Sequence, residues 1–179
     1  MSVDTADVDP EAAVELDHRP ALTSSIIAVF AGVLAMLTSG PFAGIALLFG
    51  LAGVSFLAVG LFVTGSRSWV SLGIVSLFVG ILTVGVLGTA PIPLLLISAV
   101  GLVVAWDVGQ HAITIGEQFG RTTPTQRGEL VHAAGSGLVG ILGAGGVYGV
   151  YWAGTGGQPV LAILLLLLGA ILLVWSLRE

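Results

Sequence analysis

The chain has 179 residues, of which 56% are hydrophobic and only 8% are charged. A soluble globular domain carries about 25% charged residues, so this chain has too few charges to cover a surface that faces water. A large buried core does not resolve this shortage of charges, because too few polar residues would remain to cover the outside of that core. We therefore expect an integral membrane protein that crosses the bilayer several times.

The residue types that are missing exclude several other classes of protein. The chain has no Cys, so disulfides and thiolate metal sites are excluded. The formal net charge of -5 lies wholly in residues 1–20, and the remaining acidic and basic residues balance. No basic patch exists, so we expect no nucleic-acid partner. The acidic start does not have the positive region of a secretory signal, and we interpret residues 1–20 as a mobile acidic tail, with a short helix as the alternative.

Six apolar runs approach the length of about 20 residues that a helix needs to cross a bilayer. They are residues 21–39, 42–64, 69–88, 91–106, 132–153 and 159–177. The breaks between them are rich in Gly and Pro, which mark turns. The sequence therefore predicts an all-α fold, a polytopic transmembrane helix bundle of about six spans arranged as three hairpins in a membrane domain over residues 21–179.

The charges assign the loops to the two sides of the membrane. In the six-span arrangement, both termini, loop 64–68 and segment 107–131 lie on one side and contain all five Arg residues. The loops at 39–41, 88–93 and 154–159 lie on the other side and carry no charge. Because Arg-bearing loops stay in the cytoplasm, we expect a multi-pass protein of the cell membrane with both termini cytoplasmic.

Segment 107–131 gathers most of the polar chemistry between the spans. Apolar residues recur with helical spacing after Trp106 as far as Phe119, and Thr123 with Pro124 forms a helix start. We therefore predict a cytoplasmic helical hairpin over 107–131 that extends the fourth and fifth spans. Its charged side chains form a candidate docking surface for a cytoplasmic or membrane protein: Glu117, Arg121, Arg127 and Glu129. The alternative is a solvated hairpin with local ion pairs, such as Glu117 with Arg121.

A metal site is a further interpretation of the same segment. Asp107 and His111 are four residues apart, and Glu129 and His132 form a Glu-x-x-His pair of the kind used in di-iron carboxylate bundles. Those sites take further Glu residues from other helices, and the other spans offer none. We therefore expect no cofactor, and a metal-dependent membrane enzyme stays a minor alternative.

The fifth span is unusually rich in glycine. Small residues at four-residue spacing let helices approach closely, and Gly137, Gly140, Gly145 and Gly149 are the predicted packing positions. We expect this span to be the most crowded helix, central in the bundle, with self-association into homo-oligomers also plausible. The alternative is a channel or transporter subunit for a small neutral solute that uses this helix, because no ionisable residue lies well inside any span.

The run WDVGQHAITIGEQFGR at residues 106–121, followed by ELVHAAGS at 129–136, resembles an uncharacterised family of haloarchaeal multi-pass membrane proteins. The Lys-free, acidic composition fits that source. The resemblance implies a membrane protein whose signature lies in this inner segment, and it brings no known activity or catalytic residue. Our leading hypothesis is a non-enzymatic component of a membrane complex that docks a partner through segment 107–131.

Overall fold

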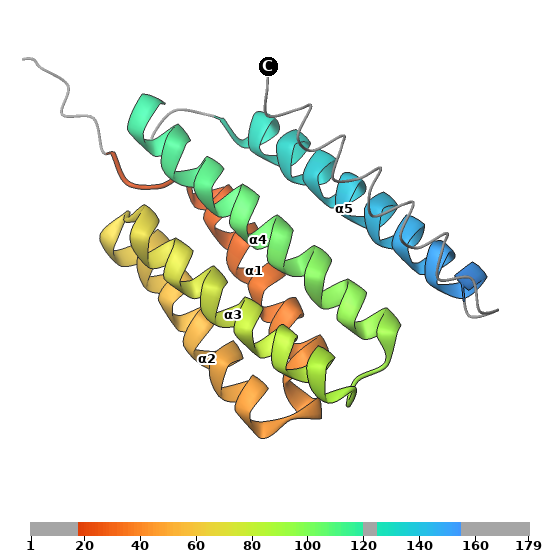
Figure 1. Cartoon of the computed structure of the whole chain (residues 1–179). Helices are drawn as coiled ribbons and strands as arrows, with labels where there is room; N and C mark the ends of the chain where they lie inside the picture. Colours follow the sequence, from red (N-terminus) through yellow and green to blue (C-terminus); the bar gives the residue numbers. More distant parts are fainter. Residues whose placement is uncertain (1–17, 120–124, 155–179) are drawn as a thin grey trace, which may run out of the picture.

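A computed structural model describes residues 18–119 and 125–154, which are almost entirely helical (Figure 1). The helices are α1 (Leu22–Ser39), α2 (Gly44–Ala58), α3 (Arg67–Leu87), α4 (Ile92–Phe119) and α5 (Gln126–Gly154). A 3-10 turn, Gly40–Phe42, links α1 to α2, and a π-helical segment, Val59–Thr64, continues α2. The described part of the chain contains no strand, so the predicted all-α class is confirmed there.

All five helices are long and apolar enough to cross a membrane, judged by length and composition. With their continuations, α1, α2 and α3 each provide 21 residues, α4 provides 28 and α5 provides 27 as far as Trp152. They run through the first five predicted apolar runs. The sixth predicted span, 159–177, and most of the acidic tail fall outside the described residues.

The helices associate as two close pairs, α1 with α4 and α2 with α3 (Figure 1). In the second pair, a Cβ atom added at Gly73 would lie 2.7 Å from the carbonyl oxygen of Gly53. In the first pair, a Cβ atom at Gly101 would lie 2.9 Å from the carbonyl oxygen of Ala31. Glycine at these positions allows the two backbones to meet directly, as small residues do between membrane helices.

The core lies where α1 and α4 meet the end of α2 and the start of α3. Its buried residues are Ala28, Ala31, Leu57, Leu61, Val70, Val104, Ala105, Val108, Ala112 and Ile113. The outward faces carry large apolar side chains instead, such as Phe30, Leu48 and Phe78. A water-soluble bundle places polar residues on that face, so the surface is suited to a hydrocarbon environment.

Helix α5 lies at the edge of the described bundle and packs on α4 and, less extensively, on α1 (Figure 1). No residue of its apolar stretch is buried among the described residues. Of the predicted packing glycines, only Gly140 has a close neighbour there, with Val100 Cγ1 2.9 Å from an added Cβ; Gly137, Gly145 and Gly149 have none within 4 Å. Within the described residues α5 is therefore peripheral and not central, and the packing role of Gly137, Gly145 and Gly149 stays a prediction, because the sixth predicted span lies outside the described residues.

The described charges gather at one end of the bundle, where α1, α3 and α5 begin and α2 and α4 end. We call it the charged end, and its ionic residues are Arg19, Arg67, Asp107, Glu117, Arg127 and Glu129. At the opposite, uncharged end the chain turns at Gly40–Ala43 and at Gly88–Pro91. This separation agrees with the loop assignment from the sequence, whereas the side of the membrane stays a prediction.

Candidate functional site

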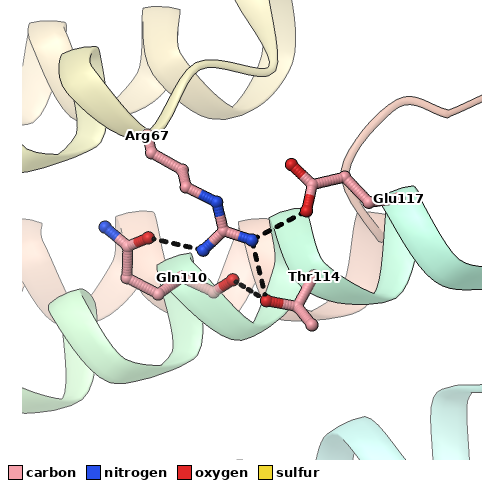
Figure 2. Close-up of polar contacts among 4 residues, drawn as sticks. All are labelled: Arg67, Gln110, Thr114 and Glu117. Carbon is pink, nitrogen blue, oxygen red and sulfur yellow. Dashed lines mark hydrogen bonds and ion pairs between the residues drawn. The ribbon is translucent and has the colours of Figure 1, made fainter.

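Arg67, the first residue of α3, joins that helix to α4 (Figure 2). Its Nη1 donates to Gln110 Oε1 over 3.1 Å, and its Nη2 donates to Thr114 Oγ1 over 3.1 Å and to Glu117 Oε2 over 2.8 Å. The three acceptors are four and three residues apart, so they share one face of α4. One guanidinium therefore binds nearly two turns of α4. We predicted Glu117 to pair locally with Arg121, but Arg121 lies outside the described residues.

Glu129 connects α5 to the start of α1. Its Oε2 accepts hydrogen bonds from the backbone N–H of Ser24 over 2.7 Å and from Ser24 Oγ over 2.8 Å. Its Oε1 accepts one from Thr125 Oγ1 over 2.7 Å. Ser24 lies in the first turn of α1, where backbone N–H groups have no partner within the helix and the helix dipole favours a negative charge. The carboxylate of α5 thus caps α1.

This position differs from the one expected for Glu129. We placed Glu129 in the docking surface, with a solvated hairpin as the alternative, and both need an accessible side chain, but Glu129 is only 2% exposed. The expectation that this side chain faces water is wrong, because the open N-terminus of α1 offers stronger donors than bulk solvent does. Glu129 is therefore a residue that ties α5 to α1, and any docking surface must use its neighbours.

His132 of α5, one helical turn after Glu129, forms a cluster with His111 and Asp107 of α4. The rings of His111 and His132 are stacked, with centroids 4.0 Å apart and planes inclined by 24°. His132 Nε2 lies 2.9 Å from Asp107 Oδ2. This contact is close but is not a directed hydrogen bond, and the nitrogen has no hydrogen-bond partner within the described part of the chain.

The setting of His111, in the part of α4 beyond the predicted span, lowers its pKa below the ordinary value of 6.5. Burial contributes most, because removal from water disfavours the charged ring, and the stacked His132 lowers the pKa further. The carboxylates of Asp107 and Glu129 oppose this effect and raise the pKa. His111 is therefore mainly neutral at pH 7.

The predicted metal candidates, Asp107, His111, Glu129 and His132, come together at this junction without forming a ligand set. No group of three or more His, Asp or Glu side chains within residues 18–119 and 125–154 could hold a metal ion. The carboxylate of Glu129 already bonds Ser24 and Thr125. The stacked imidazoles direct their lone pairs along two ring planes inclined by only 24°, and not toward a common point. The described geometry does not support the metal-centre hypothesis.

Among the predicted docking residues that the structure describes, Arg127 is exposed and has no ion-pair partner within the described part of the chain. It lines a hollow of about 750 Å³ at the charged end, together with His111, Ile115, Thr125 and Val131. The hollow therefore combines the cation of Arg127 with polar groups, the carboxylate of Glu129 among them, and with apolar side chains such as Ile115 and Val131.

The sequence did not predict that the residues just before α1 contact α4. The backbone N–H of Ala21 donates to the carbonyl oxygen of Ala112 over 2.9 Å, and the carbonyl of Arg19 lies directly against Gly116 of α4. The roles of Ser24 and Arg67 were missed as well. A partial signal was present, because the polar side chains at 110, 114 and 117 form a helical stripe.

Together these features define an all-α fold over the described residues, with five helices there that are long and apolar enough to cross a bilayer and with a polar junction at one end. The chain belongs to a family of unknown function, DUF7519, which matches residues 18–174. The predicted membership of an uncharacterised family is thus confirmed, and a haloarchaeal source stays a prediction. No curated protein and no solved structure matches the chain.

Proposed function

We propose that the protein is a non-enzymatic, multi-pass component of the cell membrane whose charged end lies in the cytoplasm and docks a partner protein. The observation that carries this proposal is the length of α4 and α5. They have 28 and 29 residues, which correspond to about 42 and 43 Å at 1.5 Å per residue. A bilayer core is about 30 Å thick, so each helix has about 12 Å to project beyond it.

Cross-helix bonds support this projecting part. Arg67 binds three side chains of α4, and Glu129 holds α5 to Ser24 of α1. A surface whose contacts join four helices, α1, α3, α4 and α5, is already ordered before a partner arrives. Binding to it therefore costs less conformational entropy than binding to a mobile loop does.

The accessible groups at the start of α5 indicate the chemistry of the partner. Arg127 is exposed, and Leu130 and Val131 are 54% and 67% exposed in the same two turns. A cation beside apolar side chains at the membrane boundary complements a protein segment with an acidic residue and an apolar face. We infer that such a segment is the partner.

Photo-crosslinking in intact cells tests this proposal. A photoreactive residue at Gln118 or Gln126, both exposed at the charged end, is expected to capture one discrete protein. The same residue at Thr89, which is exposed at the uncharged end, serves as the matched control and should not capture it. Arg127→Glu should abolish the adduct, whereas Arg127→Lys should retain it because the charge is kept. Adducts only with lipid or with other copies of the chain would overturn the proposal.

The alternatives gain no support from the described helices. A neutral-solute channel along α5 depends on its glycines, yet Gly137, Gly145 and Gly149 meet no described neighbour and α5 lies at the edge of the bundle. Solute flux in reconstituted vesicles that responds to Gly140→Leu would be needed to revive that function. A metal-dependent enzyme would need a ligand set that the described residues do not assemble.

A further inference from the structure

Two ionisable rings from different helices are in direct contact at the charged end. His111 belongs to α4 and His132 to α5, and their stacked ring centroids lie 4.0 Å apart. This stack joins the start of α5 to α4, as the bonds of Glu129 to Ser24 join it to α1. The charge on the two rings therefore acts directly on the distance between two helices.

The carboxylates beside the two rings can balance one added proton but not two. Asp107 Oδ2 lies 2.9 Å from His132 Nε2, so it compensates a positive charge on that ring. The carboxylate of Glu129 also favours a charge on His111, but its oxygens already accept three hydrogen bonds. A second proton therefore has no free carboxylate as its counter-ion among the described residues.

The other elements packed against α4 supply no further counter-charge within the described part of the chain. Helix α1 contains no acidic or basic residue, and residues 18–21 before it add His18 and Arg19 but no carboxylate. Arg67 of α3 is bound to Glu117, and Arg127 of α5 lines the same hollow as both rings and adds a positive charge. Two charged rings in the stack would repel each other at a distance where salt screens weakly.

We propose that the stacked His111 and His132 form a proton-operated latch, which holds α5 against α4 while at least one ring is neutral and releases it when both are charged. Burial and the neighbouring ring lower the pKa of His111 below 6.5, so the closed stack favours the neutral ring. A movement of α5 that separates the rings removes both penalties, and the open form then binds the proton more readily. The latch therefore opens as the pH falls below 6.5.

The consequence for a partner rests on the proposed docking function, whereas the movement itself does not. Arg127, Leu130 and Val131 of the docking surface all belong to α5. When α5 is released from α4, these side chains lose their fixed position relative to the rest of the charged end. We therefore expect the partner to be bound at neutral pH and released at acidic pH.

Distances between spin labels test the latch without any partner. Because the chain has no Cys, Ser68→Cys on α3 and Leu130→Cys on α5, both at exposed positions, carry the only labels. In the purified protein in detergent, pulsed electron paramagnetic resonance should resolve a second, longer distance as the pH drops from 8 to 5. One extra proton in the open form raises the open-to-closed ratio by up to about tenfold per pH unit. The pair Ser68→Cys and Gln118→Cys, which joins α3 to α4, is the control and should keep its distance.

Aromatic substitutions separate the charge of the rings from their packing. His111→Phe keeps a ring for the stack but cannot take a proton, so it should hold the closed distance at pH 5. His18→Phe, at the exposed third histidine of the chain, should open as the unmodified protein does. If His111→Phe fails to fold, His132→Phe gives the same test, because one uncharged ring suffices to keep the latch closed.

The outcomes separate the latch from the docking function. A pH-independent distance between Ser68→Cys and Leu130→Cys, or opening that persists in His111→Phe, overturns the latch. Lengthening in the control pair as well indicates general unfolding and overturns it too. If the latch opens but no protein is captured by crosslinking from Gln126, the docking function fails and the latch stands. Loss of that adduct at pH 5 in isolated membranes, with its retention in His111→Phe, supports both.

Discussion

At the residue scale, Glu129 illustrates how a carboxylate is kept inside an apolar protein. Burial of an ionised carboxylate costs several kcal/mol unless hydrogen bonds and charge compensate for it. Here three donors, two from Ser24 and one from Thr125, reach its oxygens. The positive end of the α1 dipole adds a favourable field. The residue therefore stabilises the fold and is not available to a partner.

Replacing Glu129 should measure this contribution. Glu129→Ala removes all three bonds and leaves the Ser24 N–H without its acceptor, so we expect the free energy of unfolding to fall by about 2 kcal/mol. Glu117→Ala, which removes an exposed ion pair with Arg67, should cost less than about 1 kcal/mol. Denaturant unfolding of the purified protein in detergent compares the two. An equal loss in both variants would contradict the capping role.

The lowered pKa of His111 makes stability depend on pH. Because burial and His132 lower this pKa below 6.5, the unfolded chain binds more protons than the folded chain between the lowered pKa and about 6.5. The free energy of unfolding should therefore fall as the pH drops through that window. Thermal unfolding at pH 8 and at pH 5 should show a smaller difference in His111→Gln than in the unmodified protein. The same difference in both would show that another group is responsible.

At the scale of elements, apolar runs predict where helices form, but they do not predict which helices pack against one another. The stripe of Val108, Ala112, Ile115 and Phe119 predicted that the fourth helix continues past Trp106, and α4 does run to Phe119. The first three of these residues are buried. The glycines of α5 permit close approach without specifying a partner, and among the described residues only Gly140 of the four predicted positions has a close neighbour. Close approaches to the backbone of a neighbouring helix occur at Gly53, Gly73 and Gly101, which the sequence did not single out.

The contact of α2 with α3 predicts a clear difference between two glycines of one helix. A Cβ atom at Gly73 would meet the backbone of α2 at 2.7 Å, whereas one at Gly85 would meet no described atom within 4 Å. Gly73→Ala should therefore cost about 1–3 kcal/mol by forcing the helices apart. Gly85→Ala should be neutral or stabilising by up to about 1 kcal/mol, because alanine favours the helix. Denaturant unfolding of the two purified variants in detergent compares their free energies of unfolding. If Gly85→Ala were the less stable variant, the backbones of α2 and α3 would not meet at Gly73.

At the scale of the whole molecule, the gathering of charge at one end predicts how the protein lies in the membrane. Moving a charged end through hydrocarbon is costly, and Arg-bearing segments are retained in the cytoplasm. We therefore predict that the charged end faces the cytoplasm and that the turns at Gly40–Ala43 and Gly88–Pro91 face outward.

Single-cysteine labelling tests this orientation without a background signal, because the chain has no Cys. In intact cells, a membrane-impermeant maleimide should label Thr89→Cys at the uncharged end. It should label Gln118→Cys at the charged end only after the membrane is permeabilised. Labelling of Gln118→Cys in intact cells would invert the proposed topology.

The sequence by itself predicted a multi-pass membrane protein, since a chain with 56% hydrophobic and 8% charged residues has too few charges to cover a surface that faces water. It also predicted helices in the first five apolar runs, because the length and periodicity of apolar segments are local properties. Only the tertiary structure decided that Glu129 caps α1, that Arg67 binds α4 and that α5 lies at the edge of the described bundle. Those contacts join residues 43 to 105 positions apart, and their geometry arises from helix packing, which no local pattern encodes.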